Sequence, residues 1–318
     1  MLNIVFLDGR ALNPGDLSFA PLEAFGNFTL YDRTPQEEVV LRAREADVLI
    51  VNKRRLGDEE FAQLPRLRLV LVSSTGYDTV DVEAARRHGV LVCNVPAYST
   101  MAVAQHTLAL LLEVCNSVGH YAQLNREGYW SRSRDFCLWD APVVELSGLP
   151  VALVGLGNIG RKVAELLHVL GAKVWAVTSR AAETLPDYIT KVSLEEAVST
   201  AHFLSLHCPL TPSTRALINA QLLTKAQPDL VIVNTARGAL IDDEAVATAL
   251  HEGRLRAYAA DVLSQEPPSA SHPLLHAPRT YLTPHIAWAS AAARMRIVDI
   301  MASNLQAFLD GRPQNVVS

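Results

Sequence analysis

A glycine-rich turn constrains the fold of this chain more than any other feature. The segment 150-PVALVGLGNIGRKVAELL-167 joins an apolar run, three glycines in the pattern G-x-G-x-x-G, and a helical pattern. Here Gly155 permits a tight turn, Gly157 lets the backbone approach a pyrophosphate, and Gly160 lets the helix pack closely on the strand. The segment predicts a nucleotide-binding βαβ unit whose helix N-terminus faces the phosphates. The alternative is a turn whose glycines serve packing alone.

Apolar runs alternate with amphipathic segments along the whole chain. The expected strands are 3–8, 47–51, 69–73 and 90–94, then 150–155, 174–177, 203–207, 230–234, 257–261 and 280–284. The expected helices are 35–46, 79–89, 101–119, 160–170, 193–200, 217–225, 242–252 and 289–309, and 120–147 is expected to be irregular. Apolar strands separated by helices predict parallel sheets covered on both faces. A length of 318 residues favours two α/β domains with doubly wound parallel sheets over one large sheet.

Charge and cysteine content exclude several classes of function. A net charge of −5 gives no electrostatic attraction to nucleic acid or to an anionic membrane. The four cysteines form no CxxC pair, so neither a metal site nor a disulfide framework is expected, and a reducing cytoplasm is the simplest location. The first residues fit a strand better than a signal peptide. The most apolar helix candidate, 101–119, carries polar residues that suit a buried helix better than a membrane span.

The end of the second strand of the βαβ unit bears on the choice of nucleotide. An Asp or Glu at this place binds the ribose hydroxyls of NAD and would repel the 2′-phosphate of NADP. The chain instead has Thr178, Ser179 and Arg180, and an arginine can pair with phosphate through charge-assisted hydrogen bonds. These residues favour NADP. The alternative is that Arg180 is a solvated loop residue and that NAD still binds.

Three charged residues follow the ends of three predicted strands. Arg237 follows 230–234, Glu266 follows 257–261 and His285 follows 280–284, and the carboxyl ends of parallel strands share one edge of a sheet. Arginine can bind a carboxylate, and a glutamate can orient a histidine and stabilise its imidazolium. The imidazolium can donate a proton to a carbonyl oxygen while hydride reaches the carbon. Each residue alone is often merely structural, but together they predict an active site.

Several segments in the right order resemble the D-2-hydroxyacid dehydrogenases over nearly the whole chain. They are 70-VLVSSTGYDTVD-81, 92-VCNVPAYSTMAVAQHTLALLL-112, 155-GLGNIG-160, 234-NTARGALIDDEAV-246, 257-AYAADVLSQEPP-268 and 283-TPHIAW-288. The resemblance implies a flavodoxin-like substrate domain (1–98 with 287–318), a Rossmann-like cofactor domain (99–286), and an active site in the cleft between them. It also implies a homodimer that pairs through residues 101–147, a helix followed by an arm.

The resemblance further implies roles for individual residues. Arg237 binds the substrate carboxylate and carbonyl, His285 is the acid/base, Glu266 supports His285, and Asp261 holds the carboxamide side of the nicotinamide. The backbone around Ser74, Thr75 and Gly76 binds the substrate carboxylate. We also expect the cofactor site to include Asn158, Ile159, His207, Pro209, Thr214, Thr235 and Ala236.

Two segments bear on the branch of the family. The segment 135-DFCLWDAPVVELSG-148 and Trp288 resemble glycerate dehydrogenases, which are also called hydroxypyruvate reductases. The implied substrate is a small 2-oxo acid such as hydroxypyruvate or glyoxylate, with Trp288 beside the pocket. Trp139 either reaches the site of a partner subunit or packs ordinarily, and ordinary packing is the stronger expectation. Glu266 fits a hydroxyacid enzyme better than a formate dehydrogenase-like one, where glutamine is expected.

Two other functions stay open. A dinucleotide-binding regulator, similar to the transcriptional corepressors related to this family, would keep the fold without needing turnover. A phosphite dehydrogenase-like oxidoreductase would share the triad Arg237, Glu266 and His285.

Overall fold

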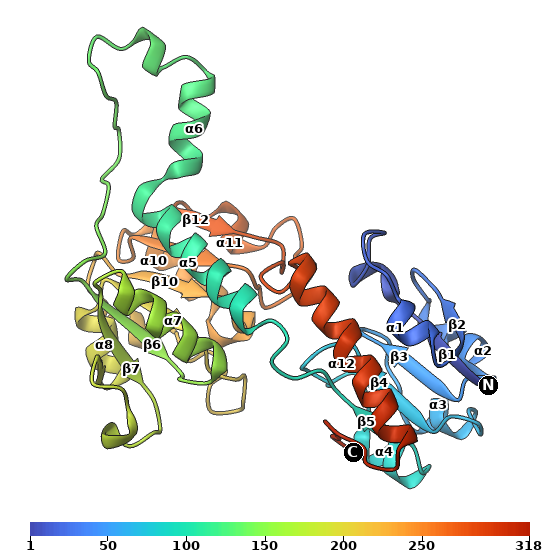
Figure 1. The fold of residues 1–318 in the computed structure, drawn as a ribbon. Helices are drawn as coiled ribbons and strands as arrows, with labels where there is room; N and C mark the ends of the chain where they lie inside the picture. The colour runs from blue at the N-terminus through green and yellow to red at the C-terminus, as the bar shows by residue number, and fades with distance from the viewer. The chain divides into compact units, whose positions relative to one another are not determined.

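The computed structural model describes all 318 residues, and the chain divides into two compact units (Figure 1). The first unit comprises Met1–Ser99 and Trp288–Ser318, and the second comprises Thr100–Ala287. Each unit has its own sheet, and every strand pair in both sheets is parallel. The prediction of two α/β domains with parallel sheets is confirmed.

The first unit contains a five-stranded sheet in the order β2-β1-β3-β4-β5. Its strands are β1 (Leu2–Phe6), β2 (Gly26–Leu30), β3 (Val48–Val51), β4 (Leu69–Val72) and β5 (Leu91–Cys93). Its helices are α1 (Ala20–Glu23), α2 (Val39–Ala43), α3 (Asp58–Ala62), α4 (Val82–Arg87) and α12 (Ala291–Leu309). Helices α2, α3 and α4 pack on one face of the sheet. All side chains of β3 and β4 are buried, which explains why these strands are apolar throughout.

The last helix returns to this unit and is tied to it by polar contacts. Arg294 on α12 pairs with Asp16 through both terminal nitrogens, at 2.7 and 2.6 Å. Asn304, which is fully buried, donates to the Asn94 carbonyl at 2.9 Å. The first unit is therefore built from the two ends of the chain.

The second unit contains a seven-stranded sheet in the order β12-β11-β10-β9-β6-β7-β8. Its strands are β6 (Pro150–Val154), β7 (Lys173–Val177), β8 (Ile189–Lys191), β9 (Phe203–Leu206), β10 (Val231–Asn234), β11 (Ala257–Ala260) and β12 (Thr280–Leu282). Its helices are α5 (Thr100–Asn116), α6 (Val118–Arg126), α7 (Asn158–Val169), α8 (Leu194–Thr200), α9 (Ala220–Leu223), α10 (Asp243–His251) and α11 (Pro273–His276). Helices α5 and α7 cover one face, and α8 to α11 cover the other. The strand order reverses between β6 and β9, and ligands of open α/β sheets bind beyond such a switch point.

Several elements differ from the sequence-based expectation, among them the short helices α1, α3 and α11, which were not expected. Strands β2 and β8 were not expected, because both lie at sheet edges and most of their side chains are partly or fully exposed. The region 120–147, expected to be irregular, begins inside helix α6, which buries none of its residues. Because α6 has no buried face, it lacks the apolar stripe by which a helix is predicted from the sequence.

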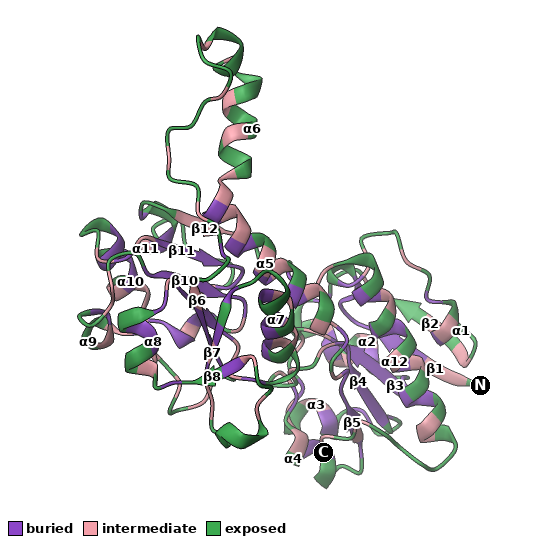
Figure 2. Cartoon of the chain, turned by 60° about the vertical axis from the view of Figure 1, so that its left-hand side comes forward, coloured by how far each residue is buried: buried purple, intermediate pink, exposed green.

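Helix α6 begins an arm, residues 118–142, that projects from the second unit and is mostly exposed, as the green segments of Figure 2 show. Several large apolar side chains on this arm are exposed to solvent: Trp130 is 54% exposed, Phe136 is 91% exposed and Trp139 is 69% exposed. The expectation that Trp139 packs in the ordinary way within the chain is therefore wrong. No single helix is long and apolar enough to span a membrane, although α5 and α6, bent by 59° at their junction, would together meet those criteria.

Candidate active site

The glycine turn between β6 and α7 has no room for a larger residue at Gly155 or at Gly160. Gly155 has a φ of +99°, and a Cβ there would lie 2.8 Å from the Cys208 backbone nitrogen. A Cβ on Gly160 would lie 2.2 Å from the Gly155 carbonyl oxygen. Gly157 caps the helix without a side-chain hydrogen bond, and a Cβ there would meet nothing within 4 Å. The turn thus leaves open space beside the first N–H groups of α7, which fits a bound pyrophosphate.

The three residues directly after β7, 178–180, carry a positive charge and no carboxylate. Thr178 and Arg180 lie in this loop, and the Arg180 backbone N–H donates to the Thr178 hydroxyl at 3.2 Å. A second cation lies beside them, because Lys191 donates from Nζ to the Arg180 carbonyl at 2.7 Å. Sequence analysis missed Lys191 because it lies on the unexpected edge strand β8. The pairing of β7 with β8 is what brings it to this loop.

The loop after β9 borders the glycine turn. The carbonyl oxygen of His207 would lie 2.9 Å from a Cβ on Gly155, so the two loops are in contact. His207 Nε2 lies 2.9 Å from the Ser205 hydroxyl, and burial lowers the pKa of His207 to about 4. Thr214 closes the loop by donating to the Pro209 carbonyl at 2.7 Å. The predicted residues His207, Pro209 and Thr214 therefore lie on one ordered loop, and the histidine is neutral at neutral pH.

The loop after β10 presents Arg237. The buried Asn234 shapes this loop, since its side chain accepts from the Ala236 N–H at 3.1 Å and donates to the Arg237 carbonyl at 2.9 Å. The Thr235 hydroxyl lies 2.8 Å from that of Thr107 on α5, which directs it into the protein. Arg237 itself is exposed, and its Nη1 donates to the Ala236 carbonyl at 2.7 Å. Its guanidinium is therefore held near the edge of the sheet by its own loop.

The loops after β11 and β12 bring Glu266 and His285 together. Glu266 Oε2 lies 2.6 Å from His285 Nδ1, and Glu266 Oε1 accepts from the Leu263 N–H at 3.0 Å. Since Nδ1 faces the carboxylate, Nε2 is the ring atom that can present a transferable proton. His285 has a φ of +55°, a left-handed conformation that is strained for histidine and is often found in functional sites.

Asp261 holds this strained turn in place. Its side chain is 1% exposed, and it accepts from the Thr283 hydroxyl at 2.6 Å, the Ile286 N–H at 2.9 Å and the Ala287 N–H at 2.7 Å. Its carbonyl accepts from the His285 N–H at 2.8 Å. Asp261 is thus a clamp on the histidine turn, a function that the sequence analysis missed. An aspartate directly after a fully buried strand was the available signal.

The sheet order places these loops side by side. Strands β10, β11 and β12 are successive neighbours in the second unit's sheet. Arg237, Glu266 and His285 therefore lie side by side at the carboxyl ends of these strands. The glycine turn follows β6 and lies at the same edge, because all seven strands are parallel. Of the predicted triad, the structure shows direct contact between Glu266 and His285.

The predicted substrate residues of the first unit follow β4. The Thr75 hydroxyl donates to the Val95 carbonyl at 2.9 Å, and Asn94 donates to the Thr75 carbonyl at 2.8 Å. The Ser74 hydroxyl donates to the Gly76 carbonyl at 2.6 Å. The backbone N–H groups of Ser74, Thr75 and Gly76 donate to no protein acceptor. This fixed loop therefore offers unused donors of the kind that bind a carboxylate.

Trp288 begins the C-terminal part of the first unit. It packs edge-on against Tyr98 at a ring-centroid distance of 6.4 Å and an interplanar angle of 77°. Within its own unit this indole therefore has an ordinary aromatic packing partner.

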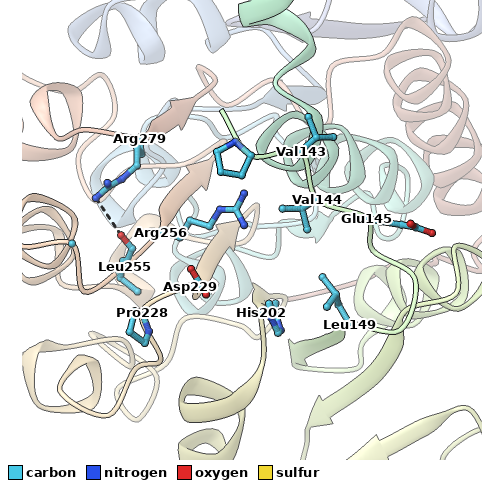
Figure 3. A pocket seen from close by; sticks show the side chains of 12 residues that line it. Val143, Val144, Glu145, Leu149, His202, Pro228, Asp229, Leu255, Arg256 and Arg279 are labelled. Atoms are coloured by element: carbon cyan, nitrogen blue, oxygen red, sulfur yellow. Dashed lines mark hydrogen bonds between the residues drawn. The ribbon is translucent and has the colours of Figure 1, made fainter. Parts of the chain in front are cut away.

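A pocket of about 720 Å³ opens at the amino ends of the strands of the second unit's sheet, opposite the carboxyl ends that carry the predicted triad (Figure 3). Its lining includes Val143 and Val144 at the root of the arm, together with His202, Arg256 and Arg279, which precede strands. Arg279 donates to the Leu255 carbonyl at 3.4 Å, the contact dashed in Figure 3. None of the predicted site residues lines this pocket.

Comparison with known proteins decides the family. Residues 108–287 match the family model described as "D-isomer specific 2-hydroxyacid dehydrogenase, NAD binding domain". The chain belongs to the D-isomer specific 2-hydroxyacid dehydrogenase family. It is 40% identical to a hydroxypyruvate reductase of Blautia hydrogenotrophica, with 100% of both chains covered. It is 34% identical to a glycerate dehydrogenase of Methylorubrum extorquens, with 99% of this chain and 98% of the relative covered.

A solved structure extends this likeness to the fold. The acyclic imino acid reductase Bsp5, in complex with NADPH and D-Arg, superposes with a TM-score of 0.84 at 28% identity, covering 100% of both chains. The resemblance expected from the sequence motifs is confirmed. A dehydrogenase of this family acts on small 2-hydroxy or 2-oxo acids, and its fold includes an NAD(P)-binding domain.

Proposed function

We propose that this dehydrogenase reduces a small polar 2-oxo acid, hydroxypyruvate or glyoxylate, to the D-2-hydroxy acid, with NADPH preferred and NADH usable. The observation that carries the proposal is the 2.6 Å contact between Glu266 and His285 at the strand edge that also bears the glycine turn. The names of the two relatives support the choice of substrate, since one is a hydroxypyruvate reductase and the other a glycerate dehydrogenase.

The triad supplies proton transfer and substrate binding. Glu266 favours the protonated form of His285 and fixes the ring, so His285 can donate a proton to the substrate's carbonyl oxygen from Nε2. Arg237 binds the carboxylate and polarises the carbonyl. When bound, the nicotinamide would supply the hydride that reaches the carbonyl carbon. In the reverse direction neutral His285 accepts the proton from the hydroxyl group.

The two units divide the other binding tasks. The unused backbone donors of Ser74, Thr75 and Gly76 bind the substrate carboxylate, and Trp288 borders the substrate. In the second unit the glycine turn, with Asn158 and Ile159 at the start of α7, holds the pyrophosphate. We further assign to the cofactor site His207, Pro209, Thr214, Thr235, Ala236 and Asp261. Residues 1–98 with 287–318 are then the substrate domain, and 99–286 the cofactor domain.

The loop after β7 supports NADPH over NADH. Thr178 replaces the carboxylate that would repel a 2′-phosphate, and Arg180 and Lys191 add two positive charges beside it. The Bsp5 structure shows that a protein of this fold binds NADPH.

The exposed arm, residues 118–142, supports a homodimer. Trp130, Phe136 and Trp139 expose large apolar surfaces that a second copy would cover, and such patches commonly mark interfaces. Light scattering should report twice the mass of one chain. A monomeric mass at micromolar concentration would contradict the dimer.

One set of assays tests the function. The protein is incubated with NADPH, and then with NADH, in the presence of hydroxypyruvate, glyoxylate or pyruvate. The loss of reduced-cofactor absorbance is followed. Turnover of hydroxypyruvate or glyoxylate supports the proposal. Binding of NADPH without turnover of any oxo acid would favour a dinucleotide-binding regulator, and turnover of phosphite alone would favour a phosphite dehydrogenase. His285→Ala should abolish turnover while NADPH binding persists.

A further inference from the structure

A buried pair of an aspartate and a histidine lies next to the active-site loops of the second unit. Asp243 begins α10 and His272 precedes α11, and Asp243 Oδ2 lies 3.2 Å from His272 Nε2. Their side chains are only 14% and 6% exposed. His272 Nδ1 accepts from the Leu274 N–H at 3.4 Å, so a neutral ring carries its proton on Nε2, toward Asp243.

Asp243 also contacts the turn that carries Glu266. Ser264 donates its hydroxyl to Asp243 Oδ2. Ser264 lies next to Leu263, whose N–H donates to Glu266 Oε1. Asp243 therefore anchors the turn from 263 to 266, and the Glu266 side chain of the same turn contacts His285.

The loop that carries Arg237 packs against the same turn. A Cβ on Gly238 would lie 1.9 Å from the Leu263 carbonyl carbon, so the two backbones are in direct contact. Asn234, which shapes the Arg237 loop, also donates to the buried Tyr258 hydroxyl at 3.5 Å. Burial raises the pKa of Tyr258, and the negative charge of Asp243 adds to this increase. Asp243 therefore contacts the turn that carries Glu266 and lies close to Tyr258, which in turn contacts Asn234 of the Arg237 loop.

The pair is an unusual arrangement for stability alone. Asp243 Oδ1 and His272 Nε2 are both shielded from solvent, and neither completes a well-aligned hydrogen bond. Buried polar groups without a full set of partners are rare, and they cost stability. What this arrangement does provide is a fixed anchor for Ser264.

We propose that Asp243 and His272 are positioning residues of the reductase, which hold the 263–266 turn so that the Glu266 carboxylate stays aligned with His285. The inference rests on the proposed acid/base function of His285. Asp243 anchors the turn through Ser264, and the His272 ring packs beside the Asp243 carboxylate, with Nε2 3.2 Å from Oδ2.

Three variants test the anchor with NADPH and hydroxypyruvate. Asp243→Asn removes the charge, Ser264→Ala removes the hydroxyl, and His272→Asn keeps an acceptor for the cap of α11 while losing the imidazole. We expect kcat to fall roughly 10-fold with Asp243→Asn and Ser264→Ala, since small displacements of catalytic groups have large effects. We expect KM for NADPH to change less than about twofold. Glu244→Gln removes an exposed carboxylate from the same turn of α10 and should leave kcat unchanged.

Two readouts separate positioning from a general structural effect. In Asp243→Asn and Ser264→Ala, the pH at which the rate of reduction falls should be lower than in the wild type. Ser264→Thr, which keeps the hydroxyl, should have the wild-type pH–rate profile. In a Glu266→Gln background, Asp243→Asn should cost less than about twofold, because the group through which it acts is already impaired. A further 10-fold loss in that background would overturn the positioning, as would an unchanged kcat in the single variants.

The test distinguishes this inference from the proposed function. If His285→Ala retains turnover, the acid/base assignment fails and the positioning inference falls with it. If His285→Ala is inactive and the Asp243 and Glu266 effects multiply, only the positioning inference fails.

Discussion

Glu266 binds two partners at once: Oε2 lies 2.6 Å from His285 Nδ1, while Oε1 accepts the Leu263 N–H at 3.0 Å. Glu266→Gln has one acceptor oxygen in place of two, so it cannot accept from both N–H groups, and it also loses the negative charge beside the imidazole. We expect the rate of 2-oxo acid reduction to fall roughly 10-fold or more, because general acid catalysis depends on the protonated ring. Steady-state kinetics with saturating NADPH checks this, and a rate equal to wild type would contradict it.

The proton transfer makes the two reaction directions differ in pH dependence. Reduction requires protonated His285 and oxidation requires the neutral ring, so reduction should favour lower pH and oxidation higher pH. Initial rates in both directions across pH 5 to about 10 test this expectation, with overlapping buffers as the control. Identical profiles for reduction and oxidation would count against the mechanism.

The loop after β7 should control cofactor preference. Thr178→Asp combined with Arg180→Ala restores a carboxylate for the ribose hydroxyls and removes a cation, so the preference should move toward NADH. The ratio of kcat/KM for NADPH to that for NADH measures the change. A double variant that keeps the NADPH preference would show that the interpretation of this loop is wrong.

Lys191 should contribute to the same preference, because its ammonium lies beside the Arg180 carbonyl. Lys191→Met should raise KM for NADPH by roughly 5- to 10-fold and leave KM for NADH within about twofold, since only NADPH has the 2′-phosphate. Lys173→Met is the matched control, because Lys173 is exposed at the other end of the neighbouring strand β7. Equal increases for both cofactors would point to a disturbed loop instead.

His207 should make the cofactor-free protein sensitive to acid. Burial lowers its pKa to about 4, below its ordinary value, so the unfolded chain binds a proton that the folded chain excludes. This stability is present above pH ~6.5 and is lost as the pH falls toward 4. Between pH 7 and 5 the loss should be about 1–2 kcal/mol, and His207→Gln should lack it. Urea unfolding midpoints at both pH values test this, with the exposed His251→Gln as control.

The glycine turn could be predicted because its information is local. The strand, the turn and the helix occupy one continuous segment, and each glycine has a steric reason that the structure shows at Gly155 and Gly160. The positions of Arg237 and Glu266 could be predicted because each follows a fully buried strand, and His285 follows the partly buried strand β12. Parallel strands bring such positions to one edge whatever the loop lengths.

Other features depend on tertiary contacts that no local pattern encodes. Lys191 belongs to a three-residue edge strand with one buried side chain, so its sequence resembles a loop. Asp243 and His272 lie on separate helices and meet only after both have packed. Asp261 was recognised as a strand-end residue, but its clamp on the turn follows from hydrogen bonds to residues more than 20 positions away.

The return of α12 to the first unit sets an order of events during synthesis. Residues 1–99 leave the ribosome before residues 100–287, yet Val298, Met301 and Leu305, which are fully buried in the same unit as residues 1–99, are made after both. Residues 100–287 form one continuous stretch and carry their complete sheet, so they can fold while the final helix is still being translated. The unit whose synthesis begins earlier is thus the one that completes its core later.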